Sequence, residues 1–312
     1  MSPKTRIKKL KLRKNNYTRK QKTRIAEQVY DISDKDVERD YKNLVEIGCE
    51  YHKVLSQTGN KVVNKYTATE RLNTVGVKNI SFYDVWFNKN ALKKEKHVKS
   101  LVKFYKNTNP SYPELKVMFR LSNLYYSAVS IFKPLIAMDV YCRYQPKCVL
   151  DFTMGWGGRL VGACALNIPK YIGVDYNKNL KVPYGKLSKF LKKQNTTTDI
   201  ELYFQDALSI DYSKFDYDLV LTSPPYYNIE TYGGNKQKSK DEWDANFYIP
   251  IFQKTYQHLA RGGHYCINIP VEVYENVALK VLGKPHEKIP LPKSKRFSTE
   301  SYHEYIYVWK KI

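Results

Sequence analysis

The chain has 312 residues, of which 42% are hydrophobic, enough for one large domain or one domain with an appendage. Lysine and arginine number 53 against 30 acids, and the resulting formal charge of +23 favours a polyanionic partner, most often nucleic acid. No run approaches 18 apolar residues, which argues against a transmembrane helix and a membrane partner. The basic N-terminal residues also lack the apolar segment of a secretory signal.

Residues 1–25 carry eleven Lys or Arg and no acid. Like charges repel at that density, so we expect a disordered basic arm that contacts phosphate or serves as a nuclear-localisation signal. Residues 26–60 show apolar spacings of three and four, and residues 91–107 form a basic amphipathic pattern. We therefore expect residues 26–115 to form a helical N-terminal region that contributes to nucleic-acid recognition.

From residue 116 onward, apolar strands alternate with helical patterns, one of which begins at Pro134, as suits a first helical turn. Alternation of this kind implies a doubly wound, mostly parallel, Rossmann-like sheet of the α/β class over residues 116–312. The strands we expect are "CVLDF", "KYIGVDYN", "IELYFQDAL", "FDYDLVLTSPPY", "GGHYCINIP" and "ESYHEYIYVWKK".

The five cysteines are scattered and form no CxxC pair. This pattern favours reduced thiols in an intracellular protein, in the nucleus or cytoplasm, and argues against a zinc site or a disulfide framework. The richness in Lys, Tyr and Asn fits an AT-rich genome and leaves a viral or phage origin open.

A glycine-rich turn, "DFTMGWGGR", joins the first of these strands to the next helix. Glycines at this point let a ligand approach the backbone, and a helix N-terminus adds positive potential. Dinucleotide binders place GxGxxG here, whereas this loop has Gly155, Gly157 and Gly158 after Asp151. An acid at the start of the loop suits a ligand with a cationic part. S-adenosylmethionine carries an ammonium and a sulfonium and no phosphate; a purely structural turn is the alternative.

Two more acids end strands at consistent places. Asp175 follows the second strand, 20 residues after Gly155, where its carboxylate can accept from ribose hydroxyls. Asp206 follows the third strand, where it can accept from an adenine amino group. Each acid alone could belong to a solvated loop. Because ligands bind at the carboxyl ends of such strands, the set including Asp151 predicts a cofactor crevice.

The fourth strand ends in Ser223, Pro224, Pro225 and Tyr226. An exocyclic amine on a base is a poor nucleophile because its lone pair is delocalised into the ring. The Ser223 hydroxyl and the Pro224 carbonyl could accept hydrogen bonds from this amine as a methyl group arrives. The prolines stiffen the turn, and the Tyr226 ring could stack on an extruded base.

Together these motifs resemble the amino methyltransferases that act on N4 of cytosine or N6 of adenine in DNA. That family combines a Rossmann-like sheet, a glycine-rich cofactor motif and an (Asp/Asn/Ser)-Pro-Pro-Tyr catalytic motif. Upstream, "SIFKPLIAMDVY" resembles the family's other cofactor motif, and this order looks like the arrangement called gamma. The resemblance covers about residues 120–312. Recognition would then come from residues 26–115 or from the insert at residues 233–246. The loop departs from the usual Pro-Phe-x-Gly-x-Gly by carrying Thr153, Met154 and Trp156.

The resemblance implies a class I methyltransferase fold, S-adenosylmethionine as cofactor and DNA as partner, with base flipping, direct methyl transfer and no metal. The cofactor-binding residues that it and the strand-end acids indicate are Phe132, Lys133, Pro134, Asp151, Thr153, Gly155, Gly157, Asp175 and Asp206. The catalytic residues are Ser223, Pro224, Pro225 and Tyr226. Methylation of an RNA amine and an idle nucleic-acid binder on the same fold stay open. C5-cytosine methylation is excluded, because no cysteine follows a proline.

Overall fold

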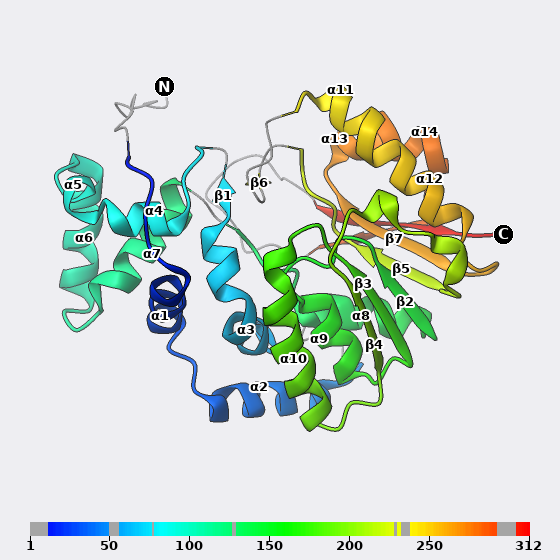
Figure 1. The fold of residues 1–312 in the computed structure, drawn as a ribbon, viewed down its shortest axis with the longest axis horizontal. Coiled ribbons are helices and arrows are strands. Elements are labelled where there is room, and N and C mark those ends of the chain that lie inside the picture. Colours follow the sequence, from blue (N-terminus) through cyan, green and yellow to red (C-terminus); the bar gives the residue numbers. More distant parts are fainter. Residues whose placement is uncertain are drawn as a thin grey trace.

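A seven-stranded sheet forms the centre of the C-terminal part in the computed structural model (Figure 1). Neighbouring strands are parallel except β9, which runs antiparallel to both of its neighbours. This confirms the doubly wound, mostly parallel, Rossmann-like sheet. The strands, in spatial order, are β4 (Asp199–Tyr203), β3 (Lys170–Val174), β2 (Cys148–Asp151), β5 (Leu219–Thr222), β7 (His264–Ile269), β9 (Tyr305–Lys310) and β8 (Glu287–Pro290). The structure describes residues 12–49, 56–76, 78–126, 129–227, 230–231, 238–291 and 304–312.

The strand order reverses between β2 and β5. The chain runs outward from β2 through β3 to β4 and then returns to pair β5 with β2 on its other side. In sheets of this type a crevice opens at the carboxyl ends of the strands at such a reversal. The turn after β2 and the Ser-Pro-Pro-Tyr segment after β5 therefore meet at the same place.

Helices cover both faces of this sheet, and alternate strand residues point to the two faces. Val149 packs with one cluster of buried side chains and Leu150 with the other. The first face carries α8 (Pro134–Tyr144), α9 (Gly158–Ala165) and α10 (Lys181–Lys193). The second face carries α12 (Ile249–Gln257) and the short helices α13 (Val271–Val273) and α14 (Leu279–Leu282), with α11 (Lys240–Trp243) just before α12 (Figure 1).

The N-terminal region is mainly helical, but part of it belongs to the core of the sheet. Buried residues of α2 and α3, among them Leu44 and Val63, share one cluster with α8 and α9. Conversely, Met118 of α7 packs with α4, α5 and α6. Residue 115 is therefore not a boundary in the packing. These helices are α1 (Arg19–Tyr30), α2 (Asp34–Ile47), α3 (Asn60–Asn73), α4 (Phe82–Phe87), α5 (Lys89–Leu92), α6 (Lys96–Thr108) and α7 (Glu114–Tyr125).

The disordered arm expected for residues 1–25 needs correction where the structure describes it. Residues 1–11 lie outside the described residues, but α1 begins at Arg19 after a capping box formed by Thr18 and Gln21. Ahead of this helix, the backbone N–H of Asn15 donates to Asp84 at 2.8 Å. The basic side chains did not prevent folding, because α1 also carries an apolar stripe that buries Ile25 in the helical core.

Two strand pairings were missed from the sequence. The edge strand β8 ends at Pro290, and proline normally argues against a strand except at an edge. The second pairing joins β1 (Val75–Gly76) to β6 (Glu230–Thr231). A strand of two residues has no periodicity to detect.

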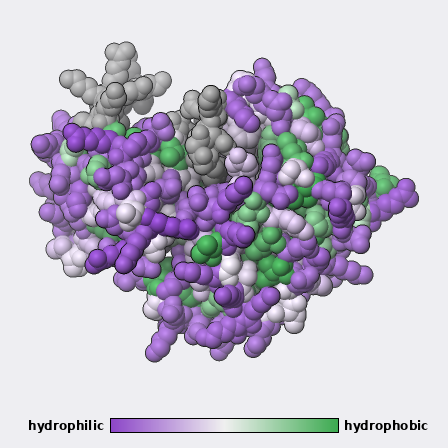
Figure 2. Space-filling view, in the orientation of Figure 1, coloured by the Kyte–Doolittle hydropathy of each residue, from purple (hydrophilic) through white to green (hydrophobic). Residues whose placement is uncertain are grey.

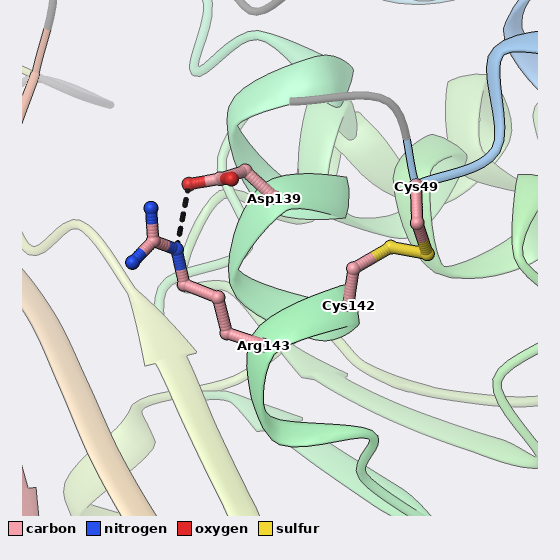
Figure 3. Close-up of a disulfide and its surroundings, with 4 residues drawn as sticks. All are labelled: Cys49, Asp139, Cys142 and Arg143. Carbon is pink, nitrogen blue, oxygen red and sulfur yellow. Dashed lines mark hydrogen bonds and ion pairs between the residues drawn. A yellow bond between two sulfur atoms is a disulfide. The ribbon is translucent and has the colours of Figure 1, made fainter. Parts of the chain in front are cut away.

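A disulfide between Cys49 and Cys142 contradicts the expectation of reduced thiols throughout (Figure 3). Cys49 follows α2 and Cys142 lies in α8, with Cα atoms 5.7 Å apart, beside the ion pair of Asp139 with Arg143. The remaining cysteines, Cys148, Cys164 and Cys266, are buried and free. Cysteine spacing in the sequence could not reveal the bonded pair, because Cys49 and Cys142 are 93 residues apart.

None of the described helices is long and apolar enough to cross a membrane.

The disulfide predicts a thiol count that differs from the number of cysteines. Denatured protein without reductant should show three reactive thiols, and reduced protein should show all five. Reduction should also lower the unfolding midpoint, since a crosslink over so long a loop stabilises by about 4 kcal/mol. Ellman titration and thermal melts measure both effects. Five thiols before reduction would contradict the pairing.

Candidate functional site

A cavity of about 730 Å³ lies at the carboxyl ends of the central strands, which is within the usual size of ligand sites. Most of the residues selected from the sequence line it, but Pro134, Asp151 and Gly157 do not. Those that line it are Phe132, Lys133, Thr153, Gly155, Asp175, Asp206, Ser223, Pro224, Pro225 and Tyr226.

Asp151 is fully buried and already paired with protein groups, which corrects its assignment to the cofactor. Its Oδ2 accepts from Arg159 Nε at 2.6 Å and from the Tyr171 hydroxyl at 2.6 Å. Its Oδ1 accepts from the Thr222 hydroxyl at 2.8 Å, and Thr222 Oγ1 lies 2.6 Å from Thr153 Oγ1. The carboxylate therefore ties the loop after β2 to α9, β3 and β5, and it supports the cavity without lining it.

The glycines of the loop have separate roles. Gly155 has a φ of +56° and lines the cavity, whereas Gly157, at +92°, is the N-cap of α9 and lies outside the lining. Both conformations are in the left-handed region that glycine adopts freely. A Cβ on Gly158 would overlap the backbone carbonyl oxygen of Phe132, so only glycine lets the Phe132 segment cross α9 at this point. Nothing local in the sequence indicates this close approach, because Phe132 lies 26 residues before Gly158.

The segment before α8 contributes Phe132 and Lys133 to the lining. The Arg159 guanidinium lies 4.9 Å from the centre of the Phe132 ring, and burial lowers the pKa of the Lys133 ammonium. Pro134 occupies the first position of α8, as its ring geometry favours, and is buried. Pro134 therefore begins helix α8 and does not line the cavity.

Asp175 holds the glycine loop and faces the cavity at the same time. Its Oδ2 accepts from the Gly155 N–H at 2.9 Å, and its Oδ1 accepts from the Asn177 N–H at 2.8 Å. Burial raises the pKa of Asp175 to about 6, although these two hydrogen bonds oppose the shift. Because the Gly155 N–H already donates to Asp175, it is not available to hold a phosphate. Each Asp175 oxygen accepts only one of these hydrogen bonds, so its second lone pair can still accept from a ligand hydroxyl.

Asp206, at the end of the segment after β4, is exposed and lies at the cavity with Ala207 and Leu208. Its Oδ1 accepts from the Leu208 N–H at 3.0 Å, which fixes the carboxylate as the cap of a short 3-10 turn. Tyr176, which is 58% exposed, follows Asp175 on the same rim. A flat ring and two carboxylates therefore line one part of the cavity.

The Ser-Pro-Pro-Tyr segment is tied to two residues that the sequence analysis did not select. Ser223 Oγ donates to Asn268 Oδ1 at 3.2 Å. The Tyr226 hydroxyl lies 2.8 Å from the same Asn268 oxygen and 2.7 Å from Glu304 Oε1. Asn268 in turn donates from Nδ2 to the Tyr305 carbonyl at 3.1 Å, which sets the orientation of its amide.

Asn268 and Glu304 both line the cavity. One signal for Asn268 was present in the sequence: it is an amide between two isoleucines, Ile267 and Ile269, in strand β7. In the structure Asn268 is 4% exposed. A buried amide in a strand normally needs hydrogen-bond partners. Glu304 gave no such signal, since it directly precedes β9 in a polar stretch.

Tyr227, the next residue after the Ser-Pro-Pro-Tyr segment, is buried and has a packing role. Its φ is +50°, its backbone N–H donates to the Tyr248 hydroxyl at 3.2 Å, and its own hydroxyl donates to Asp244 at 3.0 Å. Trp243, within the insert at residues 233–246, and Phe247, just after it, line the cavity and give it an aromatic wall. Of the expected recognition insert, residues 233–246, the structure describes residues 238–246, and residues 233–237 lie outside the described residues.

No cluster of three or more His, Cys, Asp or Glu side chains suited to a metal ion occurs among the described residues.

No protein-family model matches this chain, and no curated protein sequence matches it. Solved structures share part of the fold. An rRNA methylase from Streptococcus thermophilus is 16% identical, with a TM-score of 0.36 over 53% of this chain and 86% of its own. TrmN from Thermus thermophilus is 15% identical, with a TM-score of 0.40 over 57% of this chain and 49% of its own.

Trm5 from Methanocaldococcus jannaschii, in complex with adenosine, is 16% identical, with a TM-score of 0.34 over 53% of this chain and 42% of its own. The chain thus spans less than half of two of these three proteins. At these scores the likeness is partial and assigns no activity to this chain.

The close approach at Gly158 predicts that Gly158→Ala displaces the Phe132 segment from α9, which lowers stability and distorts the cavity. Clashes of this kind cost roughly 1–3 kcal/mol. Gly185→Ala is the matched control, because a Cβ there meets nothing within 4 Å and the helix α10 favours alanine by about 1 kcal/mol. Chemical denaturation of both variants measures the difference; equal stabilities would contradict the overlap.

Proposed function

We propose that the chain transfers a methyl group from S-adenosylmethionine to an exocyclic amino group of a DNA base, N6 of adenine or N4 of cytosine. The observation that carries this proposal is the hydrogen bond from Ser223 Oγ to Asn268 Oδ1 at the cavity. Because the Ser223 proton is directed to Asn268, the lone pairs of the serine oxygen are left to accept from an incoming amine. This is the group that methylation of a poorly nucleophilic amine needs.

The other part of the cavity fits S-adenosylmethionine by the chemistry of its side chains. Asp175 and Asp206 supply carboxylate acceptors for ribose hydroxyls and an adenine amino group, and Tyr176 offers a ring beside them. The Gly155 N–H donates to Asp175, which argues against a pyrophosphate at the loop. Phe132, Lys133 and Thr153 complete this cofactor part of the proposal. The cofactor supplies a methyl group on a positively charged sulfur.

In the proposed reaction the amine nitrogen forms a bond to the methyl carbon while the carbon–sulfur bond breaks, with the electron pair staying on sulfur. S-adenosylhomocysteine leaves as a neutral thioether, and the extra proton on nitrogen passes to water. Ser223 Oγ and the Pro224 carbonyl accept from the amine, which localises the nitrogen lone pair as the methyl group arrives. Pro225 holds the turn, and its carbonyl accepts from the Tyr248 hydroxyl.

Tyr226 is proposed to hold the extruded base with its ring. The hydroxyl is anchored to Asn268 and Glu304, so the ring has a set orientation at the cavity. A ring that is already ordered loses little entropy when a base stacks on it. Asn268 acts through Ser223 and Tyr226 and is therefore a positioning residue in this scheme.

Removal of the amine acceptor should abolish most of the activity while leaving cofactor affinity near normal. Ser223→Ala and Asn268→Ala should each lower methyl transfer by roughly 100-fold, the usual loss for one positioned hydrogen-bonding group. Tyr226→Ala should lower transfer similarly, and Tyr226→Phe should retain more because the ring remains. Labelled S-adenosylmethionine assays with calorimetric binding of S-adenosylhomocysteine separate the two effects. Full activity of Ser223→Ala would remove the basis of the proposal.

The substrate is tested by offering duplex DNA, single-stranded DNA and tRNA separately and identifying the methylated nucleoside after digestion. Methylated adenine or cytosine amines in DNA are expected. Label found only in RNA would mean that the chain methylates an RNA amine instead. Label in no nucleic acid would contradict methyl transfer and favour a nucleic-acid-binding protein without catalytic activity.

The raised pKa of Asp175 predicts a pH dependence of cofactor affinity. The folded protein holds the Asp175 proton up to about pH 6, and the protonated carboxyl loses its full acceptor capacity. Affinity for S-adenosylhomocysteine should therefore rise as the pH increases from 5 to 7 and level off above, and Asp175→Asn should remove this dependence. Quenching of tryptophan fluorescence at Trp156 and Trp243, which line the cavity, provides the titration. A flat wild-type profile would contradict the assignment.

A further inference from the structure

We infer that the outer face of α6 binds single-stranded nucleic acid, at a surface separate from the cavity. At 3.6 residues per turn, four lysines of this helix fall within an arc of about 80°. The four are Lys96, Lys99, Lys103 and Lys106, and all are exposed. In Figure 1 this helix lies at the edge of the molecule away from the sheet, and the same edge in Figure 2 is mostly hydrophilic.

The charge of this stripe is uncompensated. Helix α6 contains no acid, and within the part of the chain that the structure describes no carboxylate forms an ion pair with any of the four lysines. The contrast is with Lys89 and Lys93 nearby, which both pair with Glu114. Four unpaired cations at regular spacing along one helix match a phosphate backbone, whose counterions are released on binding.

An exposed aromatic side chain lies on the neighbouring face of α6, about 100° around the helix from Lys103. Phe104 is 58% exposed, and its ring lies edge-on to Tyr105 at 5.5 Å between centroids. Tyr105 stacks on Tyr112 at 5.9 Å, and Arg120 donates from Nε to the Tyr112 hydroxyl at 2.7 Å while facing both rings. A single exposed phenylalanine is ordinary. This one is backed by an ordered aromatic array, so it offers a rigid face to a flat partner.

Cations in a row with an exposed ring beside them favour a single strand over a duplex. A single strand presents its phosphates and the faces of its bases together, and base–aromatic stacking does not depend on sequence. A duplex presents the phosphates but keeps its base faces inside the stack. The outer face of α6 would thus be a nucleic-acid-binding surface of the helical N-terminal region. This binding is independent of the proposed methyl transfer and can be measured without cofactor.

The electrostatic part is tested with two matched triple variants of the full chain. Lys99→Ala, Lys103→Ala and Lys106→Ala remove three charges from α6, and Lys186→Ala, Lys189→Ala and Lys192→Ala remove three exposed charges from α10. Fluorescence anisotropy with labelled single-stranded DNA, its RNA counterpart and a duplex gives affinity against salt concentration. The α6 triple should lower the salt slope for single strands by about 2, at roughly 0.7 per phosphate contact, and the α10 triple should change it less.

The stacking part is tested at Phe104. Phe104→Ala and Phe104→Leu should weaken single-strand binding roughly tenfold without changing the salt slope, and Phe104→Trp should retain it. Val182→Ala on α10 is the control, because Val182 is 55% exposed and has no ring. Circular dichroism melts verify that each variant is folded. Three outcomes would each overturn the inference. They are wild-type affinity in Phe104→Leu, equal losses of affinity in the two lysine triple variants, and tighter binding of the duplex than of the single strands. Comparison of the affinities for single-stranded DNA and for its RNA counterpart shows which of the two the surface prefers.

Discussion

The buried pair of Asp151 and Arg159 is the interaction on which the candidate site depends. Both side chains are removed from water, where an unpaired charge would be strongly unfavourable, and breaking such a pair typically costs about 3–5 kcal/mol. The Asp151 carboxylate, at the end of β2, joins this strand to three other elements, because Arg159 lies in the first turn of α9 while Tyr171 and Thr222 belong to β3 and β5. The glycine loop between Asp151 and Arg159 is therefore held on its buried side, and its other side lines the cavity.

On this foundation the reversal of strand order brings two kinds of chemistry together. The ends of β2, β3 and β4 present a backbone loop and carboxylates, while the ends of β5 and β7 present hydroxyl and amide groups with the ring of Tyr226. Thr153 and Thr222, whose hydroxyl oxygens lie 2.6 Å apart, join the two parts directly. The N-terminal region supports the same loop from outside, because the Thr67 hydroxyl of α3 donates to the Trp156 carbonyl at 3.1 Å. The helices before the sheet are thus part of the site's framework.

Much of the fold followed from local pattern, and the misassignments share one cause. An acid at the end of a strand looks the same in sequence whether its partner is a ligand or an arginine eight residues later. Asp175 and Asp206 therefore line the cavity while Asp151, chosen by the same rule, does not. Asn268 was missed for the complementary reason: the strand that carries it comes about 40 residues after Ser223, and only the folded sheet places their side chains 3.2 Å apart.

The sequence by itself determined the alternation of strands and helices, the two turns at the cavity and the strong positive charge, because each depends on residues close together in the chain. Tertiary structure alone decided which acids face the cavity, why Gly158 must be glycine, that Cys49 meets Cys142 and that α2 and α3 join the core of the sheet. These contacts join residues far apart in the sequence, whose distances are set by packing rather than by spacing. The double proline after β5 belongs to both groups: its rigidity is local, but the amide that orients the serine before it comes from another strand.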